Sequence, residues 1–280
     1  MLRAIRIALT VVLLALSLRA QQLEMRFLDV GQGDAILIRE GGKTALVDTG
    51  RSANIILQLQ VLGIDTIDLL VASHNHADHI GGMVAVLSGT GVRYYLDNGV
   101  PHTSAVYLRT IQAVVESGAQ YLRASDRTIA LGSAQLRVLP PPPVHGQNNS
   151  SAGLLVEYGE FRALLTGDSE LYELRYWLAN ETIPRVQVVK VAHHGSWNGT
   201  SPEWVERTRP KVAVISVGAR NSYGLPHRDP VMRTGVGLLP MSRLGSRGIY
   251  PVASVAYCCS SVPGIGTSSS QVMLIGRLPA

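Results

Sequence analysis

The chain has 280 residues, enough for one large domain or two small ones, and its 46% content of apolar residues suits a packed core. Its formal net charge of +5 comes from the two ends, because all 20 acidic residues lie between Glu24 and Asp229 and are accompanied there by only 18 basic residues. The sequence thus shows no sign of the clustered basic face with which duplex-binding proteins usually neutralise phosphates.

The first 20 residues are typical of an export signal. Arg3 and Arg6 precede an uncharged run, IALTVVLLALSL, which is shorter than the roughly 20 residues that span a bilayer. Leu18 stands where a small residue is preferred for cleavage after Ala20, so an uncleaved N-terminal anchor is one alternative and a buried helix is another. We expect an exported, extracytoplasmic protein, periplasmic or secreted, with membrane attachment through the N-terminus if the segment is retained.

Short apolar strands alternate with helical segments from residue 23 onward. In the first half, strands are predicted over residues 23–30, 35–40, 44–50 and 67–73, with a helix over 52–63 that ends at Gly63 and a second helix that Ser104 caps and Gly118 ends. In the second half, strands are predicted over residues 161–167, 186–192 and 211–217, separated by helices over 169–179 and 201–208.

The order of these elements predicts an α/β fold with one domain of two layered halves over residues 21–231. The proline-rich stretch 139–151 between the halves cannot join a central ladder and is predicted to be a loop. Residues 232–280 contain no acidic residue and no lysine and are rich in Gly, Ser and Pro, so one hypothesis is a divergent or frame-shifted end. Cys258 and Cys259 are adjacent, a spacing that strains any mutual disulfide.

The stretch SHNHADHIGG, residues 73–82, directly follows a buried strand and concentrates metal-binding donors. Residues two apart on an extended segment point the same way, so His74 and His76 can present imidazoles to one metal ion. Asp78 and His79, at the turn into the next helix, can face a second ion. A surface position in a polar loop is the alternative for one such histidine but does not explain the whole pattern.

Two further strand ends carry donors. Asp168 ends ALLTGD, where a helix-capping role is the alternative, and His193 and His194 follow the strand VQVVKVA. Ligands usually bind at the carboxyl ends of the strands in open α/β sheets, so we expect these side chains to converge. The sequence predicts a centre for one or two divalent ions, zinc or alternatively manganese, that activates a water for attack on an ester or phosphoester.

The motifs, in their order along the chain, resemble the metallo-β-lactamase superfamily, and most closely the hydrolase domain of ComEC-type competence DNA-uptake proteins. The stretches that carry this resemblance, within residues 23–231, are LDVGQGDAILI, ALVDTG, SHNHADHIGG, LLTGD, VAHHGS and ISVGARNSYGLPH. It implies an αββα sandwich with a metal site along one edge.

The resemblance also assigns roles to single residues. It makes His74 and His76 ligands of a first metal and Asp78 and His79 ligands of a second, with Asp168 bridging and His193 favoured over His194 to complete the set. Asp48 would orient the ligand loop, and Gly31 and Gly33 would let the backbone turn tightly beside the site. The residues assigned to catalysis are Asp78, His194 and His227.

Two departures from the family pattern affect this transfer. The superfamily usually supplies a further histidine before the TGD strand, where this chain has Asn148, Asn149 and Ser150, with His145 as an unproven substitute. The ComEC branch typically has Tyr-Gly-His-Pro, whereas this chain has Leu225 at the histidine position and His227 two residues later. Leucine can neither ligate a metal nor donate a proton, so either His227 takes over or the step is impaired.

The leading interpretation is a metal-dependent hydrolase of phosphodiester bonds, in a small molecule or a nucleic acid. No run after the leader approaches the length of a transmembrane helix, so the membrane channel of ComEC-type proteins is not expected in this chain. One alternative is a hydrolase of another ester, a thioester or a lactam, which would use the same chemistry. A second is a decayed hydrolase that serves as a non-catalytic binding module, which Leu225 favours and the intact histidine motif opposes.

Overall fold

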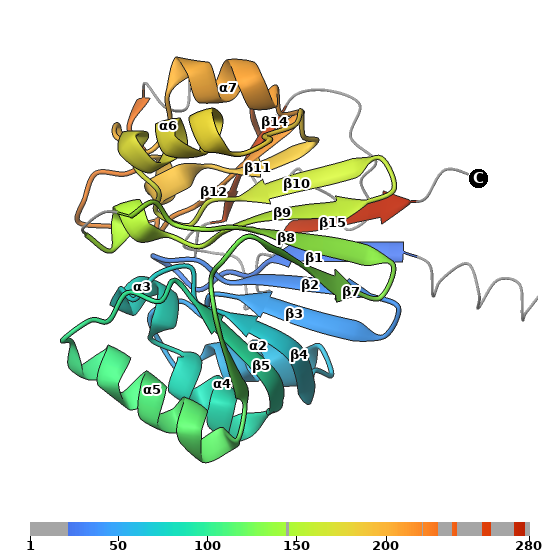
Figure 1. Cartoon of the computed structure of the whole chain (residues 1–280), viewed down its shortest axis with the longest axis vertical. Coiled ribbons are helices and arrows are strands. Elements are labelled where there is room, and N and C mark those ends of the chain that lie inside the picture. Colours follow the sequence, from blue (N-terminus) through green and yellow to red (C-terminus); the bar gives the residue numbers. More distant parts are fainter. Residues whose placement is uncertain are drawn as a thin grey trace, which may run out of the picture.

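The computed structural model describes residues 22–143, 146–219, 221–228, 237–239, 254–258 and 272–277. The predicted leader, His145 and most of the segment 232–280 lie outside these residues. Two β-sheets pack face to face, with α3, α4 and α5 on the outside of one sheet and α6 and α7 on the outside of the other (Figure 1). This arrangement confirms the predicted αββα sandwich.

The first sheet has the strand order β15-β1-β2-β3-β4-β5-β6, and the four strands from β3 to β6 run parallel. Its strands are β1 (Gln22–Phe27), β2 (Ile36–Glu40), β3 (Lys43–Val47), β4 (Thr66–Val71), β5 (Gly91–Asp97), β6 (Gln120–Arg123) and β15 (Val272–Arg277). The helices between its strands are α2 (Ile55–Val61), α3 (Ala77–Ile80), α4 (Met83–Gly89) and α5 (Ala105–Ser117).

The second sheet has the order β13-β14-β12-β11-β10-β9-β8-β7 and is parallel from β10 to β13. Its strands are β7 (Arg127–Leu131), β8 (Ala134–Leu139), β9 (Gly153–Tyr158), β10 (Phe161–Leu165), β11 (Val188–Lys190), β12 (Val212–Ser216), β13 (Gly237–Leu239) and β14 (Ser254–Cys258). Its helical segments are η1 (Asn148–Ser150), α6 (Leu171–Asn180), η2 (Ala192–Gly195) and α7 (Pro202–Thr208).

Three strands come from the C-terminal segment for which the sequence predicts no regular element. β14 pairs in parallel with β12 of the second sheet, and β15 pairs antiparallel with β1 of the first, where Gln22 lies opposite Arg277. This segment therefore contributes to both sheets. A divergent or frame-shifted origin for it stays a prediction.

The core has three parts, which correspond to the three interfaces between the four layers. In β1, alternate residues are buried, so Leu23, Met25 and Phe27 pack into the cluster between the sheets together with Leu136 and Leu154 of the second sheet. A second cluster lies between the first sheet and its helices, and a third lies between the second sheet, α6 and α7. The two sheets are thus fixed face to face by apolar burial.

The helix boundaries follow local chemistry. The Ser104 side chain accepts a hydrogen bond from the Tyr107 amide, and Gly118 adopts the left-handed conformation that ends α5. Ser201 accepts from the Trp204 amide at the start of α7, with Pro202 next to it. These features confirm the predicted caps. Within the described ranges, no helix combines the length and the apolar content needed to cross a membrane.

Replacing Leu154 by alanine should lower the free energy of unfolding by about 2–5 kcal/mol, because it leaves a cavity between the sheets. Leu154 is fully buried on β9. The matched control is Leu57→Ala on α2, where the side chain is 58% exposed and the loss should stay within about 0.5 kcal/mol. Urea denaturation followed by circular dichroism measures both, and equal losses would contradict the inter-sheet position of the core.

Candidate metal centre

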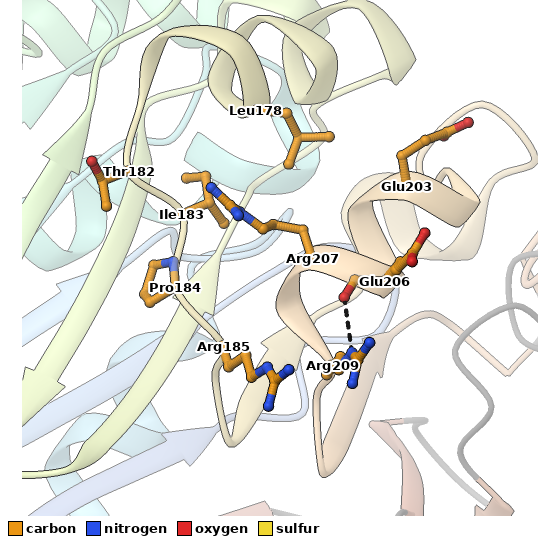
Figure 2. A pocket seen from close by; sticks show the side chains of 9 residues that line it. All are labelled: Leu178, Thr182, Ile183, Pro184, Arg185, Glu203, Glu206, Arg207 and Arg209. Carbon is orange, nitrogen blue, oxygen red and sulfur yellow. Dashed lines mark hydrogen bonds between the residues drawn. The ribbon is translucent and has the colours of Figure 1, made fainter.

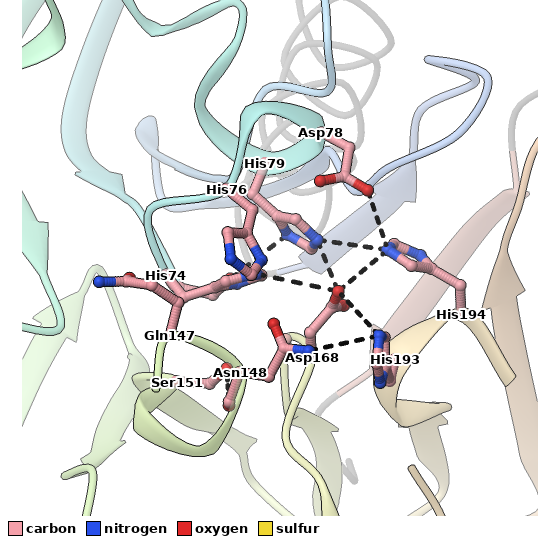
Figure 3. A network of polar contacts seen from close by, with 12 residues as sticks. His74, His76, Asp78, His79, Gln147, Asn148, Ser151, Asp168, His193 and His194 are labelled. Carbon is pink, nitrogen blue, oxygen red and sulfur yellow. Dashed lines mark hydrogen bonds and ion pairs between the residues drawn. The ribbon is translucent and has the colours of Figure 1, made fainter. Parts of the chain in front are cut away.

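The histidine motif begins where β4 ends. His74 is fully buried, and His76 has an extended backbone at the N-cap of α3, which carries Asp78 and His79 in its single turn. His74 Nε2 lies 3.0 Å from His76 Nδ1, and the ring of His79 lies 4.2 Å from that of His74. The strand end and the short helix together direct three imidazoles to one place (Figure 3).

Asp168 lies at the centre of this group. It follows β10 and Thr166-Gly167, and its Oδ1 lies 3.2 Å from His79 Nε2. Its Oδ2 lies 3.3 Å from His194 Nε2 and 3.9 Å from His74 Nε2. One carboxylate thus touches histidines from β4 and from β11, which belong to different sheets (Figure 3). This is the position that a bridging ligand requires.

His193 and His194 lie in η2 after β11, both in the left-handed backbone region at φ values of 50° and 53°. His194 is buried, its Nδ1 donates to the Ser216 carbonyl at 2.8 Å, and its Nε2 lies 3.6 Å from Asp78 Oδ2. His193 is 23% exposed, and its Nε2 is 4.0 Å from Asp168 Oδ2. Both rings reach Asp168, but only His194 also reaches the α3 ligands.

Two imidazole nitrogens, those of His79 and His194, face each other and show whether the site fits a cation. His79 donates from Nδ1 to Asp48 and His194 donates from Nδ1 to Ser216, so both direct Nε2 inward, where the two atoms are 3.3 Å apart. Two neutral Nε2 lone pairs at that distance repel each other unless a proton or a metal ion lies between them. A divalent ion between the two atoms would take the place of such a proton, so the donor set fits this ion.

Among the residues that the structure describes, four groups of three side chains have ligand atoms within 4.8 Å of one another. Two of them are formed by predicted ligands alone: one has His74, His79 and Asp168, and the other has Asp78, His79 and His194. The remaining two add Asp34, in one case to Asp48 and His79 and in the other to Asp168 and His194. His76 and His193 belong to none of these groups, although both lie at their border.

The electrostatics favour the protonation states that metal ligands need at His74 and Asp168, whereas His79 would lose a proton when an ion binds. Burial, and then the neighbouring His79, hold the pKa of His74 well below its ordinary value. Burial opposes ionisation of Asp168, but His194 and His79 hold the pKa of that carboxyl well below its usual range. Burial also opposes a charged His79, whose pKa Asp168 and Asp48 nevertheless raise well above its ordinary value in the metal-free protein. Asp168 is thus a carboxylate and His74 a neutral imidazole.

Asp48 lies behind the centre, as the resemblance implies. Its Oδ2 lies 2.7 Å from His79 Nδ1 and accepts from the Ser73 hydroxyl, while its Oδ1 accepts from the Ser73 amide. These bonds orient the His79 ring and hold the start of the histidine loop against β3. Asp48 itself has a left-handed φ of 59°.

The glycines of the GQGD turn lie beside the site. Gly33 has a φ of 130°, and a Cβ there would lie 2.0 Å from the Asp78 carbonyl oxygen. Only glycine allows this approach of the two backbones, which places the turn against α3. Gly31 has a φ of 75° in the same turn.

The segment before the TGD strand reaches the centre through amides. Asn148 and Asn149 donate to the two carboxylate oxygens of Glu170 at 3.1 and 2.9 Å. The Asn148 amide nitrogen also lies 3.4 Å from His193 Nε2. Where the superfamily usually has a histidine, this chain thus has an asparagine that contacts His193.

His227 lies next to the centre without touching it. Its amide donates to the Gly195 carbonyl at 2.9 Å, and its Nδ1 accepts from the Trp197 amide at 3.1 Å. In the part of the chain that the structure describes, no hydrogen bond or ion pair joins His227 to Asp168 or to the clustered histidines. Leu225 packs against the third core cluster. A catalytic role for His227 stays a prediction.

Two charged residues of the centre were not predicted from the sequence. Asp34 is 1% exposed and Lys190 is fully buried, with Lys190 Nζ 2.5 Å from Asp34 Oδ2. The signal for Lys190 was a lysine inside the apolar strand VQVVKVA, where a charge is expected only with a partner. The signal for Asp34 was an acid between a glycine turn and an apolar strand.

Comparison with known proteins identifies the fold and its relatives. The model of the Metallo-beta-lactamase superfamily matches residues 28–219. The metallo-beta-lactamase fold protein YhfI from Bacillus subtilis superposes with a TM-score of 0.53 at 11% identity, covering 90% of this chain and 99% of that structure. At this identity the likeness shows the fold alone.

Two curated relatives share the motifs. ComE operon protein 3 of Bacillus subtilis (strain 168) is 29% identical over 232 residues, which cover 73% of this chain and 30% of the relative. Recombination protein 2 of Haemophilus influenzae is 31% identical over 216 residues, which cover 74% of this chain and 26% of the relative. The chain thus spans less than a third of their length. These findings confirm the resemblance to ComEC-type competence proteins.

Replacing Asp48 by asparagine should weaken divalent metal binding by about 10- to 100-fold, because the carboxylate that orients His79 is lost. Asparagine tolerates the left-handed backbone of this position, so the substitution does not add strain. Competition with a chromogenic chelator measures the affinity. The matched control is Asp65→Asn at an exposed position, and equal affinities of the two variants would contradict the role of Asp48.

Proposed function

The chain belongs to the metallo-β-lactamase superfamily, a family of metal-dependent hydrolases, and we propose that it hydrolyses phosphodiester bonds. One observation carries this proposal: imidazoles and carboxylates from the ends of β4, β10 and β11 converge on Asp168. Members of the superfamily bind one or two divalent ions, and the groups around Asp168 have the composition of such sites. A bound divalent ion acts as a Lewis acid and lowers the pKa of a water that it binds to a value near neutral pH.

The distances favour a particular division of the ligands. We assign His74, His76 and Asp168 to one ion and Asp78, His79, His194 and Asp168 to the other. His194 is preferred to His193 because it is buried, directs Nε2 inward and lies within 3.6 Å of Asp78. This assignment reverses the preference drawn from the sequence.

His193 then becomes the candidate for contact with substrate. Its ring is partly exposed, and its Nδ1 is held by the Asn198 side chain at 3.1 Å, so the ring has a fixed orientation at the border of the centre. His227 is the candidate proton donor to the leaving group. Its Nδ1 accepts from the Trp197 amide, so the neutral ring carries its proton on Nε2.

Exposed aromatic rings on the segments around the centre support a substrate with a planar group, such as a nucleotide. Trp197 is 63% exposed and follows His194 by three residues, a chain length of at most about 11 Å. Tyr223 is 58% exposed and lies on the loop whose His227 forms hydrogen bonds with Gly195 and Trp197. Tyr172 is 53% exposed and follows Asp168 by four residues. Base stacking on such rings tolerates any sequence, because every base has a π-face.

The competing enzyme is a hydrolase of another ester, a thioester or a lactam, because the same ions would activate the same water. The name of one relative, Recombination protein 2, favours a substrate connected with recombination, and thus a nucleic acid. The competence-protein relatives favour an envelope-associated role, and export through the N-terminal segment remains part of this proposal.

The third candidate is a non-catalytic binding module. Leu225, which packs against the core where the ComEC branch has a histidine, favours it. The intact cluster around Asp168 opposes it, because buried histidines and carboxylates would have no compensating function without a metal.

The first test is hydrolysis of bis-p-nitrophenyl phosphate and of a chromogenic β-lactam by the full chain, stripped with chelator and reloaded with zinc or manganese. Only the phosphodiester should turn over, and only with metal. The Asp168→Asn variant should hydrolyse the phosphodiester more than about 100-fold more slowly. Loss of a residue that only orients a metal ligand already costs about 10- to 100-fold in activity. The control is Asp65→Asn, which should keep the rate.

Turnover of the lactam alone would overturn the phosphodiester proposal in favour of the competing enzyme. Fewer than one bound zinc ion per chain, together with no turnover of either compound, would favour the non-catalytic module.

The second test uses tryptophan fluorescence to detect stacking. Trp177 and Trp204 are buried, so Trp197 is the one tryptophan of the three open to a ligand. A dinucleotide should quench the emission, whereas its abasic analogue should not. Trp197→Ala should raise KM for the dinucleotide by about 5- to 150-fold, equivalent to about 1–3 kcal/mol of stacking, with kcat little changed.

Tyr121→Ala is the control for this test. Tyr121 is an exposed aromatic residue on β6, a strand that carries none of the centre's residues. Equal quenching by the dinucleotide and the abasic analogue would exclude stacking on Trp197.

A further inference from the structure

Lys190 is a fully buried lysine beneath the metal centre. It is the last residue of β11, and its Nζ lies 2.5 Å from Asp34 Oδ2 and 3.6 Å from Asp168 Oδ1. The same atom donates to the Gly167 carbonyl at 2.8 Å. Burying an ammonium is costly unless carboxylates and hydrogen bonds surround it, and here all three partners do so. Lys190 is therefore a fixed positive charge inside the protein.

Asp34 has the geometry of a metal ligand. It is 1% exposed, and its carboxylate completes two of the four groups that could hold an ion. Its Oδ2 lies 3.8 Å from His79 Nδ1 and its Oδ1 lies 3.9 Å from His194 Nδ1, but these two nitrogens donate to Asp48 and to Ser216. The donors left for a cation beside Asp34 are oxygen atoms: the Lys190 ammonium lies among the carboxylates of Asp34 and Asp168 and the Gly167 carbonyl, where a metal cation would find the same three partners.

The charges of the centre show what Lys190 changes. Asp34, Asp48, Asp78 and Asp168 bring four negative charges, and Lys190 reduces them to three. Two divalent ions then leave one positive charge to attract an anionic substrate. Without Lys190 the same carboxylates would balance two divalent ions completely, and the unpaired Asp34 would be free to bind a further cation.

We propose that Lys190 occupies a third cation position beneath the two-metal centre, so that Asp34 pairs with an ammonium group and does not ligate metal. The lysine also contacts the bridging carboxylate of Asp168 from below. It is thus a positioning residue that limits the number of ions the centre accepts. That the centre holds two metal ions rests on the proposed function, whereas the pairing of Asp34 with Lys190 does not.

The test is the number of Zn²⁺ and of Mn²⁺ ions bound per full chain, measured by equilibrium dialysis and elemental analysis. Lys190→Ala should bind one more ion than the unmodified chain, because it frees Asp34 and opens space beside it. Asp34→Asn should bind the same number as the unmodified chain. The double variant, Lys190→Ala with Asp34→Asn, should lose the additional ion.

Two results would overturn the proposal. If Asp34→Asn alone loses an ion, Asp34 is a metal ligand and Lys190 does not reserve it. If Lys190→Ala gains no ion, the lysine does not fill a cation position, and a purely structural lysine would give this result with a loss of stability only. If Lys190→Ala does not fold, Asp34→Asn, which keeps the lysine, can still overturn the proposal by losing an ion.

Failure of the proposed function would look different. A chain that binds metal but hydrolyses no phosphodiester would disprove the proposed phosphodiesterase activity. The ion counts of the unmodified chain and of its three variants would be unaffected. The ion count is measured without turnover, so the two outcomes are separable.

Discussion

The mutual repulsion of buried carboxylates is the constraint on which the centre depends. Asp34, Asp48 and Asp168 are each at most 3% exposed and lie together at one edge of the sandwich. Buried negative charges persist only where positive partners offset them. Each carboxylate accordingly has one: Asp48 and Asp168 both contact His79, and Asp34 contacts Lys190. Two of these contacts, Asp34 with Lys190 and Asp168 with His79, join segments of the two sheets.

The backbone around the centre is held in conformations that non-glycine residues rarely adopt. Asp48, His193 and His194 all have positive φ values, and they belong to the turns that follow β3 and β11. Such conformations cost free energy and persist where the surrounding structure fixes them. Here the fixing contacts are the hydrogen bonds of Asp48 to Ser73 and of His194 to Ser216. The rigid sheets therefore support a strained site.

Much of the fold could be predicted from local patterns. Alternating burial defines β1, and serine caps with a following glycine or proline define α5 and α7. The convergence of His74, His79 and Asp168 could also be predicted, because each follows an apolar strand in a fold whose strand ends meet at one edge. These features depend on neighbours in the sequence or on topology alone.

The remainder depends on tertiary contacts. The sequence could not decide which of His193 and His194 is the metal ligand. The left-handed turn that points the two rings in different directions is fixed by contacts to Ser216 and Asn198. The sequence also could not predict the contact of Asp34 with Lys190, because Asp34 precedes β2 of the first sheet and Lys190 ends β11 of the second. The strands of the C-terminal segment were missed because their composition is typical of loops, although β14 and β15 pair with central or N-terminal strands.

The pairing of β1 with β15 has a consequence for the order in which the protein assembles. β1 leaves the ribosome before β15, so one of its two edges receives its hydrogen-bonding partner only when residues 272–277 have been made. Until then that edge offers unpaired backbone groups to any extended peptide nearby, which is a recognised route to aggregation. Synthesis thus passes through a period in which β1 needs protection, and a chaperone or rapid translation of the residues up to β15 would supply it.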